Sequence, residues 1–252
     1  MTDISATMAI LGVGLCIPDE TVAEQLGITG VALDVSTPLK PMDRRRASVA
    51  TRVATTAADQ ACQAASVAPT LPTIFSSSVG EIQTTDKLCR AIARKDYPLS
   101  PTQFHNSVHN TAAGYWSMAT GNTAAMQAMG AMDDGFALAL LEAWCQLQTI
   151  STRVLLVVYD ETIPTKLLPN NNWTTCAFAL VLDRNGNDRP LLYQPVQASL
   201  PVSTISTPAF AIQNPALACI SVFQALQKNE SGRHHLNLSG GKKRWVIDLE
   251  IP

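Results

Sequence analysis

The chain has 252 residues, of which 46% are hydrophobic and only 15% are charged, and its formal net charge is -2. This balance gives no electrostatic reason to expect nucleic acid or an anionic membrane surface as a partner. Globular domains usually carry roughly 25% charged residues, and a buried subunit interface is one candidate explanation for the lower fraction in this chain.

The six cysteines lie far apart, without a CxxC pair and without a histidine at metal-ligand spacing. We therefore expect reduced, mostly buried thiols, with no metal and no cofactor. The first residues include an acidic side chain and only a short apolar stretch, so neither a cleaved signal peptide nor a membrane span is expected. These features predict a cytoplasmic protein.

Apolar, β-branched runs along the chain have the length and composition of buried strands. They are Ala9–Cys16, Thr73–Ser76, Val154–Tyr159, Cys176–Leu182, Leu191–Val196 and Trp245–Ile251. Gly12–Gly14 within the first run is an incomplete dinucleotide fingerprint, and a tight turn or strand end explains it more simply.

Helical patterns lie between several of these runs, which predicts an α/β fold. The alanine-rich segment Arg46–Ala65 indicates one helix, and Asp133 or Asp134 is suited to cap a second. Asn214 and Pro215 suit the N-cap and first position of a third helix. The expected apolar faces of the last two helices are Phe136, Leu140, Leu141 and Trp144, and Leu217, Ile220 and Phe223. Polar composition predicts a turn at Arg184–Arg189 and a loop or linker at Gln197–Ala211.

Three stretches carry a resemblance to a known family. MDRRRASVATRVA (Met42–Ala54) resembles the arginine-rich helix start of the β-ketoacyl synthase-like N-terminal family, and IFSSSVGE (Ile74–Glu81) resembles the strand and turn that follow. SPTQFHNSVHNTAAGYWSMATG (Ser100–Gly121) resembles the SPxxFxxSVHN signature of that family and leads towards VLLVVYDE (Val154–Glu161). The resemblance spans roughly residues 8 to 185.

The resemblance implies a thiolase-like fold, a mixed five-stranded sheet with helices that a full ketosynthase contains twice. We expect residues 1–185 to form one such half, with 186–252 as a truncated remnant of the second half packed on it in a single globular unit. The short members encoded beside a full-length ketosynthase in aryl polyene pigment clusters are most similar. They are regarded as chain-length-factor-like partners.

The family's nucleophilic cysteine opens the helix after the signature, where this chain has QAMGAMDDGFALAL. Depending on the position of the gap, the cysteine is replaced by Gly130 or Met132, and neither can attack a thioester. Asp133 and Asp134 would raise the pKa of any thiolate there, although helix capping explains them more simply. The family's histidines of the second half lie in GTxxxxD and GH contexts, and neither context occurs after Asp183. His234 and His235 lie in a polar stretch expected to be an exposed loop. The chain is therefore not expected to be an enzyme.

The signature segment itself is rich in histidine and asparagine but lacks a metal-binding context such as HExxH. The family places it at the dimer interface beside the acyl tunnel. The residues expected there are His105, Asn106, Ser107, Val108, His109, Asn110, Tyr115, Trp116, Met118, Met126 and Met129. Arg44, Arg45 and Arg46 are either a solvated surface or a docking site for a carrier protein or partner, and the sequence does not choose between the two.

The sequence thus predicts a non-catalytic partner of a full-length β-ketoacyl-ACP synthase that shapes the acyl tunnel at a heterodimer interface. Acyl carrier protein is a further expected partner, and the pathway would be type II polyketide, aryl polyene or fatty-acid-like biosynthesis. The alternative is a stand-alone decarboxylase or acyltransferase that uses His109 or Cys145, although core packing explains Cys145 better. A structural homodimer is a third hypothesis.

Overall fold

The computed structural model describes residues 7–28, 33, 37–171, 173–186, 188–198, 214–236 and 244–252. The strands are β1 (Thr7–Cys16), β2 (Thr73–Ser76), β3 (Met126–Met129), β4 (Arg153–Asp160), β5 (Cys176–Asp183), β6 (Leu191–Tyr193), β7 (Val196–Ala198), β8 (Gly232–His235) and β9 (Arg244–Glu250). The α-helices are α1 (Glu20–Gln25), α2 (Pro41–Arg46), α3 (Val49–Ala65), α4 (Ile82–Arg94), α5 (Pro101–His105), α6 (Thr111–Thr120), α7 (Gly135–Thr149) and α8 (Ile220–Lys228). Two short 3-10 helices are η1 (Met132–Asp134) and η3 (Pro215–Cys219).

The described strands form one mixed sheet in the order β3-β2-β4-β5-β1-β6-β9-β7, with β8 paired to β9. Strands β3, β2 and β4 are parallel, whereas β5 runs antiparallel to both β4 and β1. The first five strands of this order are the mixed five-stranded sheet with helices that was predicted for half a ketosynthase. Their parallel members direct the carboxyl ends of β2, β3 and β4 to one edge.

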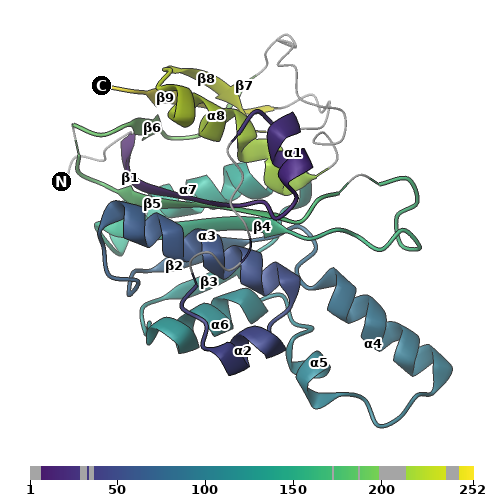
Figure 1. The fold of residues 1–252 in the computed structure, drawn as a ribbon. Helices are drawn as coiled ribbons and strands as arrows, with labels where there is room; N and C mark the ends of the chain where they lie inside the picture. The colour runs from purple at the N-terminus through teal and green to yellow at the C-terminus, as the bar shows by residue number, and fades with distance from the viewer. Residues whose placement is uncertain are drawn as a thin grey trace.

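Helices cover both faces of the sheet, α3 and α6 on one side and α7 with η3 and α8 on the other (Figure 1). Successive side chains of a strand point to opposite faces. Accordingly, Leu155 and Val157 of β4 join the apolar cluster beneath α3, whereas Leu156 and Val158 join the cluster beneath α7. A strand buried on both faces has a continuous apolar sequence, and the run VLLVV in β4 is of this kind.

Helix α3 packs unusually close to β1. A Cβ atom added at Gly12 or Gly14 would overlap the carbonyl oxygens of Ala61 and Ala57, respectively. The glycines therefore lie in the middle of a strand, and the expectation of a turn or strand end at Gly12–Gly14 was wrong. Close contact between helix and sheet explains this pair of glycines.

The residues after position 185 extend the same sheet rather than forming a separate layer. Strand β6 pairs with both β1 and β9, and η3 with α8 packs beside α7 (Figure 1). The expected cap at Asn214 is confirmed, because its side chain accepts a hydrogen bond from the backbone N–H of Ala216. The division at 185/186 stays a prediction, and residues 199–211 of the expected loop lie outside the described residues.

Three expectations about local structure were wrong. His234 and His235 lie half-buried on β8 and pair with β9, so they are not loop residues. Asp134 occupies the N-cap position of α7, but its side chain makes no capping hydrogen bond. The arginine run ends α2, and α3 begins separately at Val49 with Ser48 as its N-cap. Cations at the C-terminal turn of α2 interact favourably with the helix dipole.

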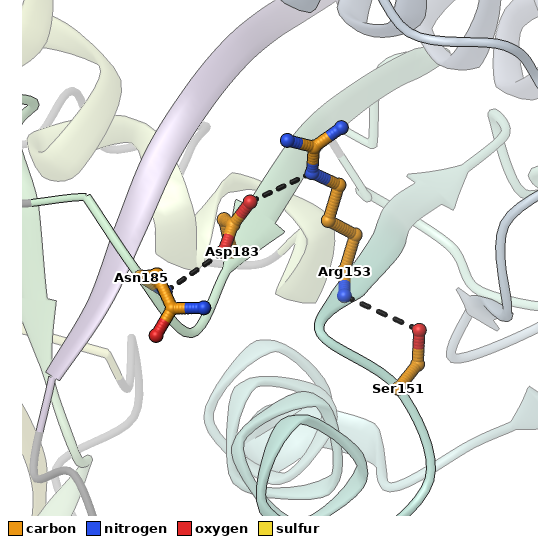
Figure 2. A network of polar contacts seen from close by, with 4 residues as sticks. All are labelled: Ser151, Arg153, Asp183 and Asn185. Atoms are coloured by element: carbon orange, nitrogen blue, oxygen red, sulfur yellow. Dashed lines mark hydrogen bonds and ion pairs between the residues drawn. The ribbon is translucent and has the colours of Figure 1, made fainter.

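The amino end of β4 and the carboxyl end of β5 are joined by a polar network (Figure 2). The Arg153 Nε donates to Asp183 Oδ2 at 2.7 Å, and the backbone N–H of Asn185 donates to Asp183 Oδ1 at 2.7 Å. The backbone N–H of Arg153 also donates to the Ser151 hydroxyl at 3.2 Å. This network lies at the edge opposite to the carboxyl ends of β2, β3 and β4.

Candidate functional site

The turn from β3 into α7 is the sharpest feature at the carboxyl edge. Met132 adopts φ of +46°, a left-handed conformation that residues other than glycine rarely adopt, and its side chain is 61% exposed. A strained strand-to-helix turn is the way in which several enzymes present a nucleophile. Here a thioether is presented, and a thioether has no proton to lose.

We call the turn at Met132 the elbow, and the turn after β2 supports it. The hydroxyl groups of Ser76 and Ser78 each donate a hydrogen bond of 3.3 Å, to the carbonyls of Gly135 and Met132 respectively. The backbone N–H of Ser77 donates to the Met129 carbonyl at 3.1 Å, which extends the pairing of β2 with β3. The serines are therefore structural supports of the elbow.

His109 lies beneath the elbow, where two glycines make room for its ring. A Cβ added at Gly80 would be 3.0 Å from the imidazole Cδ2, and one at Gly130 would be 3.3 Å from Nε2. The Nε2 atom lies 2.9 Å from the carbonyl oxygen of Ser77. Because a carbonyl can only accept, Nε2 carries a proton and donates it to this bond.

Asp160, at the carboxyl end of β4, is 1% exposed and ties three segments together. Its Oδ1 accepts hydrogen bonds from the Ser77 hydroxyl at 2.8 Å and from the backbone N–H groups of Ser78 at 2.9 Å and Val79 at 3.4 Å. Its Oδ2 accepts from the backbone N–H of Ala216 at 3.2 Å. Burial raises the pKa of Asp160 to about 6, although these donors act in the opposite direction.

Two further buried carboxyl groups adjoin Asp160. Glu161 Oε1 accepts a hydrogen bond of 2.9 Å from the backbone N–H of Gln83 in the first turn of α4. Glu81 Oε1 accepts from the hydroxyls of Ser48 and Thr51, both at 2.8 Å, at the start of α3. Burial raises the pKa of Glu161 to about 7 and also raises that of Glu81. We call Glu81, Asp160 and Glu161 the carboxyl cluster.

Sequence reasoning did not identify the carboxyl cluster as a feature, although IFSSSVGE and VLLVVYDE were both noted. The available signal was the position of the acidic residues directly after two buried strand runs. Parallel neighbouring strands bring their carboxyl ends together, so such residues meet. Among the described residues, no group of three histidine, cysteine, aspartate or glutamate side chains is arranged to hold a metal ion.

The signature segment contributes both core and surface residues. Asn106 is buried, donating from Nδ2 to the Arg46 carbonyl at 2.6 Å and accepting from the Tyr115 hydroxyl at 3.2 Å. Trp116 is fully buried against α3 and therefore belongs to the core of this chain rather than to an outward face. The hydroxyl of Ser107 donates to the Phe104 carbonyl at 2.8 Å and so closes the end of α5.

An outward face forms where α5 and α6 meet β3. Phe104, Val108 and Met118 are 66%, 49% and 67% exposed. Val108 and Met118 line a cavity of about 310 Å³ whose other walls include Met126 of β3, and Phe104 is the chain neighbour of His105 in that wall. The cavity is lined by His105, Val108, Asn110, Thr111, Gly114, Tyr115, Ser117, Met118 and Met126. We call this surface the α6 face. Met129 does not belong to it, because Met129 packs against the cluster beneath α7.

A second cavity of about 350 Å³ adjoins the α6 face and reaches α2. It shares Tyr115, Met118 and His105 with the first cavity and adds Arg46 and Asp43. Arg45 and Arg46 are exposed, and Arg44 is half-buried. The arginine run therefore borders the α6 face, next to the residues expected at an interface.

The sequence profile of the family described as beta-ketoacyl synthase, N-terminal domain, matches residues 25–246. The chain belongs to this family. The match covers most of the chain and continues past residue 185. No curated protein sequence matches the chain.

Solved ketosynthase structures have the same fold as this β-ketoacyl synthase domain. The chain matches a ketosynthase (ApeO) in complex with its chain length factor (ApeC) from Xenorhabdus doucetiae at 20% identity and a TM-score of 0.71, with 97% of this chain and 100% of that chain covered. It matches AntDE:AntF, a type II acyl carrier protein in complex with its ketosynthase, at 12% identity and a TM-score of 0.72, with 98% and 99% covered. The chain also matches the ishigamide ketosynthase/chain length factor at 14% identity and a TM-score of 0.58, with 88% of this chain and 73% of that chain covered.

These matches confirm the predicted thiolase-like fold. Cys145 lies in the third turn of α7, away from the helix N-terminus, and partial desolvation, followed by the charge of Glu142, raises its thiol pKa. The expectation that Cys145 packs in the core was wrong, because the residue is exposed. Among the described helices, none is long and apolar enough to cross a membrane.

Proposed function

We propose that this chain is a non-catalytic, chain-length-factor-like partner of a full-length β-ketoacyl-ACP synthase. The observation that carries the proposal is the elbow at Met132. Its backbone conformation is that of a residue presented for reaction, yet its thioether cannot form a thiolate. A fold that retains the presenting turn without a nucleophile is suited to a supporting subunit.

The α6 face supplies the surface for such a partner. Its exposed apolar side chains, Val108 and Met118, border a cavity next to β3, which ends the described sheet on that side. Exposed apolar groups and an unpaired strand edge both favour association with another chain. The matching ketosynthase and chain-length-factor complexes support association with a ketosynthase. With the ketosynthase on the α6 face, the volume left by the cavity walls would set product length in type II polyketide, aryl polyene or fatty-acid-like biosynthesis.

The alternative, a stand-alone decarboxylase or acyltransferase, receives less support. His109 Nε2 is already engaged with the Ser77 carbonyl, and the raised pKa of the Cys145 thiol disfavours its thiolate. Release of carbon dioxide from malonyl-loaded carrier protein by the isolated chain, abolished by a His109→Ala substitution, would favour this alternative.

Co-expression with a ketosynthase encoded beside it tests the proposal. A 1:1 complex is expected by size-exclusion chromatography with light scattering, and Met118→Glu is expected to weaken it at least tenfold. Ile150→Glu is the matched control, because Ile150 is 62% exposed but lies at the end of α7, away from the α6 face. A chain that forms only a stable self-pair, or that ignores the ketosynthase, would contradict the proposal.

A further inference from the structure

Residues 82–105, which include α4 and α5, form an arm that extends away from the sheet (Figure 1). Leu88 is the buried residue of α4, and α5 has none. The arm exposes Ile92, Tyr97 and Phe104, which are 50%, 65% and 66% accessible. With so little of its surface packed on the body, the arm depends for its position on contacts at its two ends, the root at Gln83 and the end of α5, where the His105 ring contacts Tyr115.

The root of the arm is built from the carboxyl cluster. Glu161 accepts the backbone N–H of Gln83, and the Gln83 side chain donates to the Thr162 carbonyl at 3.1 Å. These two bonds join the first turn of α4 to the end of β4, since α4 has no capping bond from its own N-cap side chain. Asp160 holds the preceding turn through Ser78 and Val79.

The three carboxyl groups are buried without a counter-charge in contact. Glu81, Asp160 and Glu161 are 1–2% exposed, and among the described residues no lysine or arginine forms an ion pair with them. Glu81 Oε2 is buried and has no hydrogen-bond partner. A buried carboxyl oxygen without a donor is far better tolerated when the group is neutral.

We propose that Glu81, Asp160 and Glu161 form a proton-dependent latch, which holds the root of the arm against β4 when protons are shared and releases it when all three groups are ionised. This inference does not depend on the proposed partnership with a ketosynthase. Asp160 ionises first, because four donors serve its oxygens. Ionisation of Glu161, which accepts from Gln83, and of Glu81, the N-cap residue of α4, then places like charges beside the first turn of α4, where their repulsion separates α4 from β4.

The surroundings of the latch do little to offset this repulsion. Lys87 of α4 is the cation whose field reaches Glu161. Tyr159 of β4, Cys176 of β5 and Tyr115 of α6 face the cluster, and burial raises the pKa of each, so they stay neutral over the relevant range. The His109 ring contacts the turn after β2, where its Nε2 donates to the Ser77 carbonyl. At the start of α3 the hydroxyls of Ser48 and Thr51 donate to Glu81.

Two native cysteines allow the arm to be measured directly. Cys89 on α4 and Cys145 on α7 are exposed, whereas Cys16, Cys62, Cys176 and Cys219 are buried. Nitroxide spin labels on Cys89 and Cys145 of the full chain report the distance between arm and body by double electron–electron resonance. We expect a narrow distance distribution at pH 5.5 and a broad one at pH 8.5, with the change occurring as Glu161, whose pKa burial raises to about 7, and Glu81, whose pKa burial also raises, lose their protons.

Glu161→Gln keeps an acceptor for the Gln83 N–H without a charge, so this variant should retain the narrow distribution at pH 8.5. Glu81→Gln is a second variant with the same expected direction, which keeps the test valid if the first fails to fold. Glu24→Gln, at an exposed position of α1, should behave as the unsubstituted chain. A distribution that does not change with pH overturns the latch. Broadening at pH 8.5 that persists in both cluster variants also overturns it.

Discussion

The hydroxyl of Ser78 donates a hydrogen bond of 3.3 Å to the carbonyl oxygen of Met132, so the turn after β2 holds the elbow after β3. The left-handed conformation of Met132 destabilises the folded chain by about 1 kcal/mol, because Met132 has a Cβ atom. Met132→Gly should therefore be more stable to urea than Met132→Ala, by about 0.5–1 kcal/mol. Equal stability of the two variants would contradict a strained elbow.

Asp160 is expected to be the most sensitive acidic residue of the carboxyl edge. In Asp160→Asn the amide oxygen can replace Oδ1, but the amide nitrogen then faces the backbone N–H of Ala216. That N–H keeps Asn214 Oδ1 as its acceptor, so the new amide N–H is the buried donor that is left unsatisfied. A buried unsatisfied donor costs about 1–3 kcal/mol, so a loss of roughly 2 kcal/mol is expected at pH 8. The exposed Asp96→Asn is the control and should change the free energy of unfolding by less than about 0.5 kcal/mol.

The sequence predicted the sheet well because burial on both faces leaves long apolar runs such as Val154–Tyr159. The sequence also located the signature segment, because that motif is local. The edge strand β3 was not predicted, because it is short and half-exposed and its sequence MQAM has no strong strand pattern. Features that depend on contacts between distant segments were not predicted either. The carboxyl cluster joins residues 81 and 161, so its hydrogen bonds could not be inferred from either segment alone.

The position of Trp116 at the candidate site was also not predictable from the sequence. Aromatic side chains are common both in cores and in interfaces, so a sequence position cannot assign one to either. The helical repeat of α6 places Trp116 against α3 and Met118 in the solvent, two residues further along. Only the direction of the helix relative to the sheet decides which residues remain for a partner.

Close packing of α3 on β1 gives a prediction with an internal control. Gly14→Ala would place a methyl group onto the Ala57 carbonyl and should cost about 1–3 kcal/mol or prevent folding. Gly114→Ala in α6 has no neighbour within 4 Å of the added Cβ and should gain about 0.5–1 kcal/mol from helix propensity. Urea unfolding followed by far-ultraviolet circular dichroism measures both, and a stabilising Gly14→Ala would contradict the observed helix–sheet contact.

Glu161 should make stability depend on pH between its ordinary pKa and its raised one. Burial raises the pKa from 4.5 to about 7, so the folded chain holds this proton more tightly than the unfolded chain does. The stabilising contribution is fully present below about pH 4.5 and is lost as the pH rises through about 7.

The free energy of unfolding of the unsubstituted chain should therefore decrease more steeply between pH 4.5 and pH 7.5 than that of Glu161→Gln, which has no proton to release. Urea titrations at intervals across this range measure the difference between the two curves. Glu24→Gln should follow the unsubstituted chain, because its side chain is exposed. Parallel curves for the unsubstituted chain and Glu161→Gln would show that Glu161 has the same proton affinity in the folded and unfolded chains, and that its burial does not perturb it.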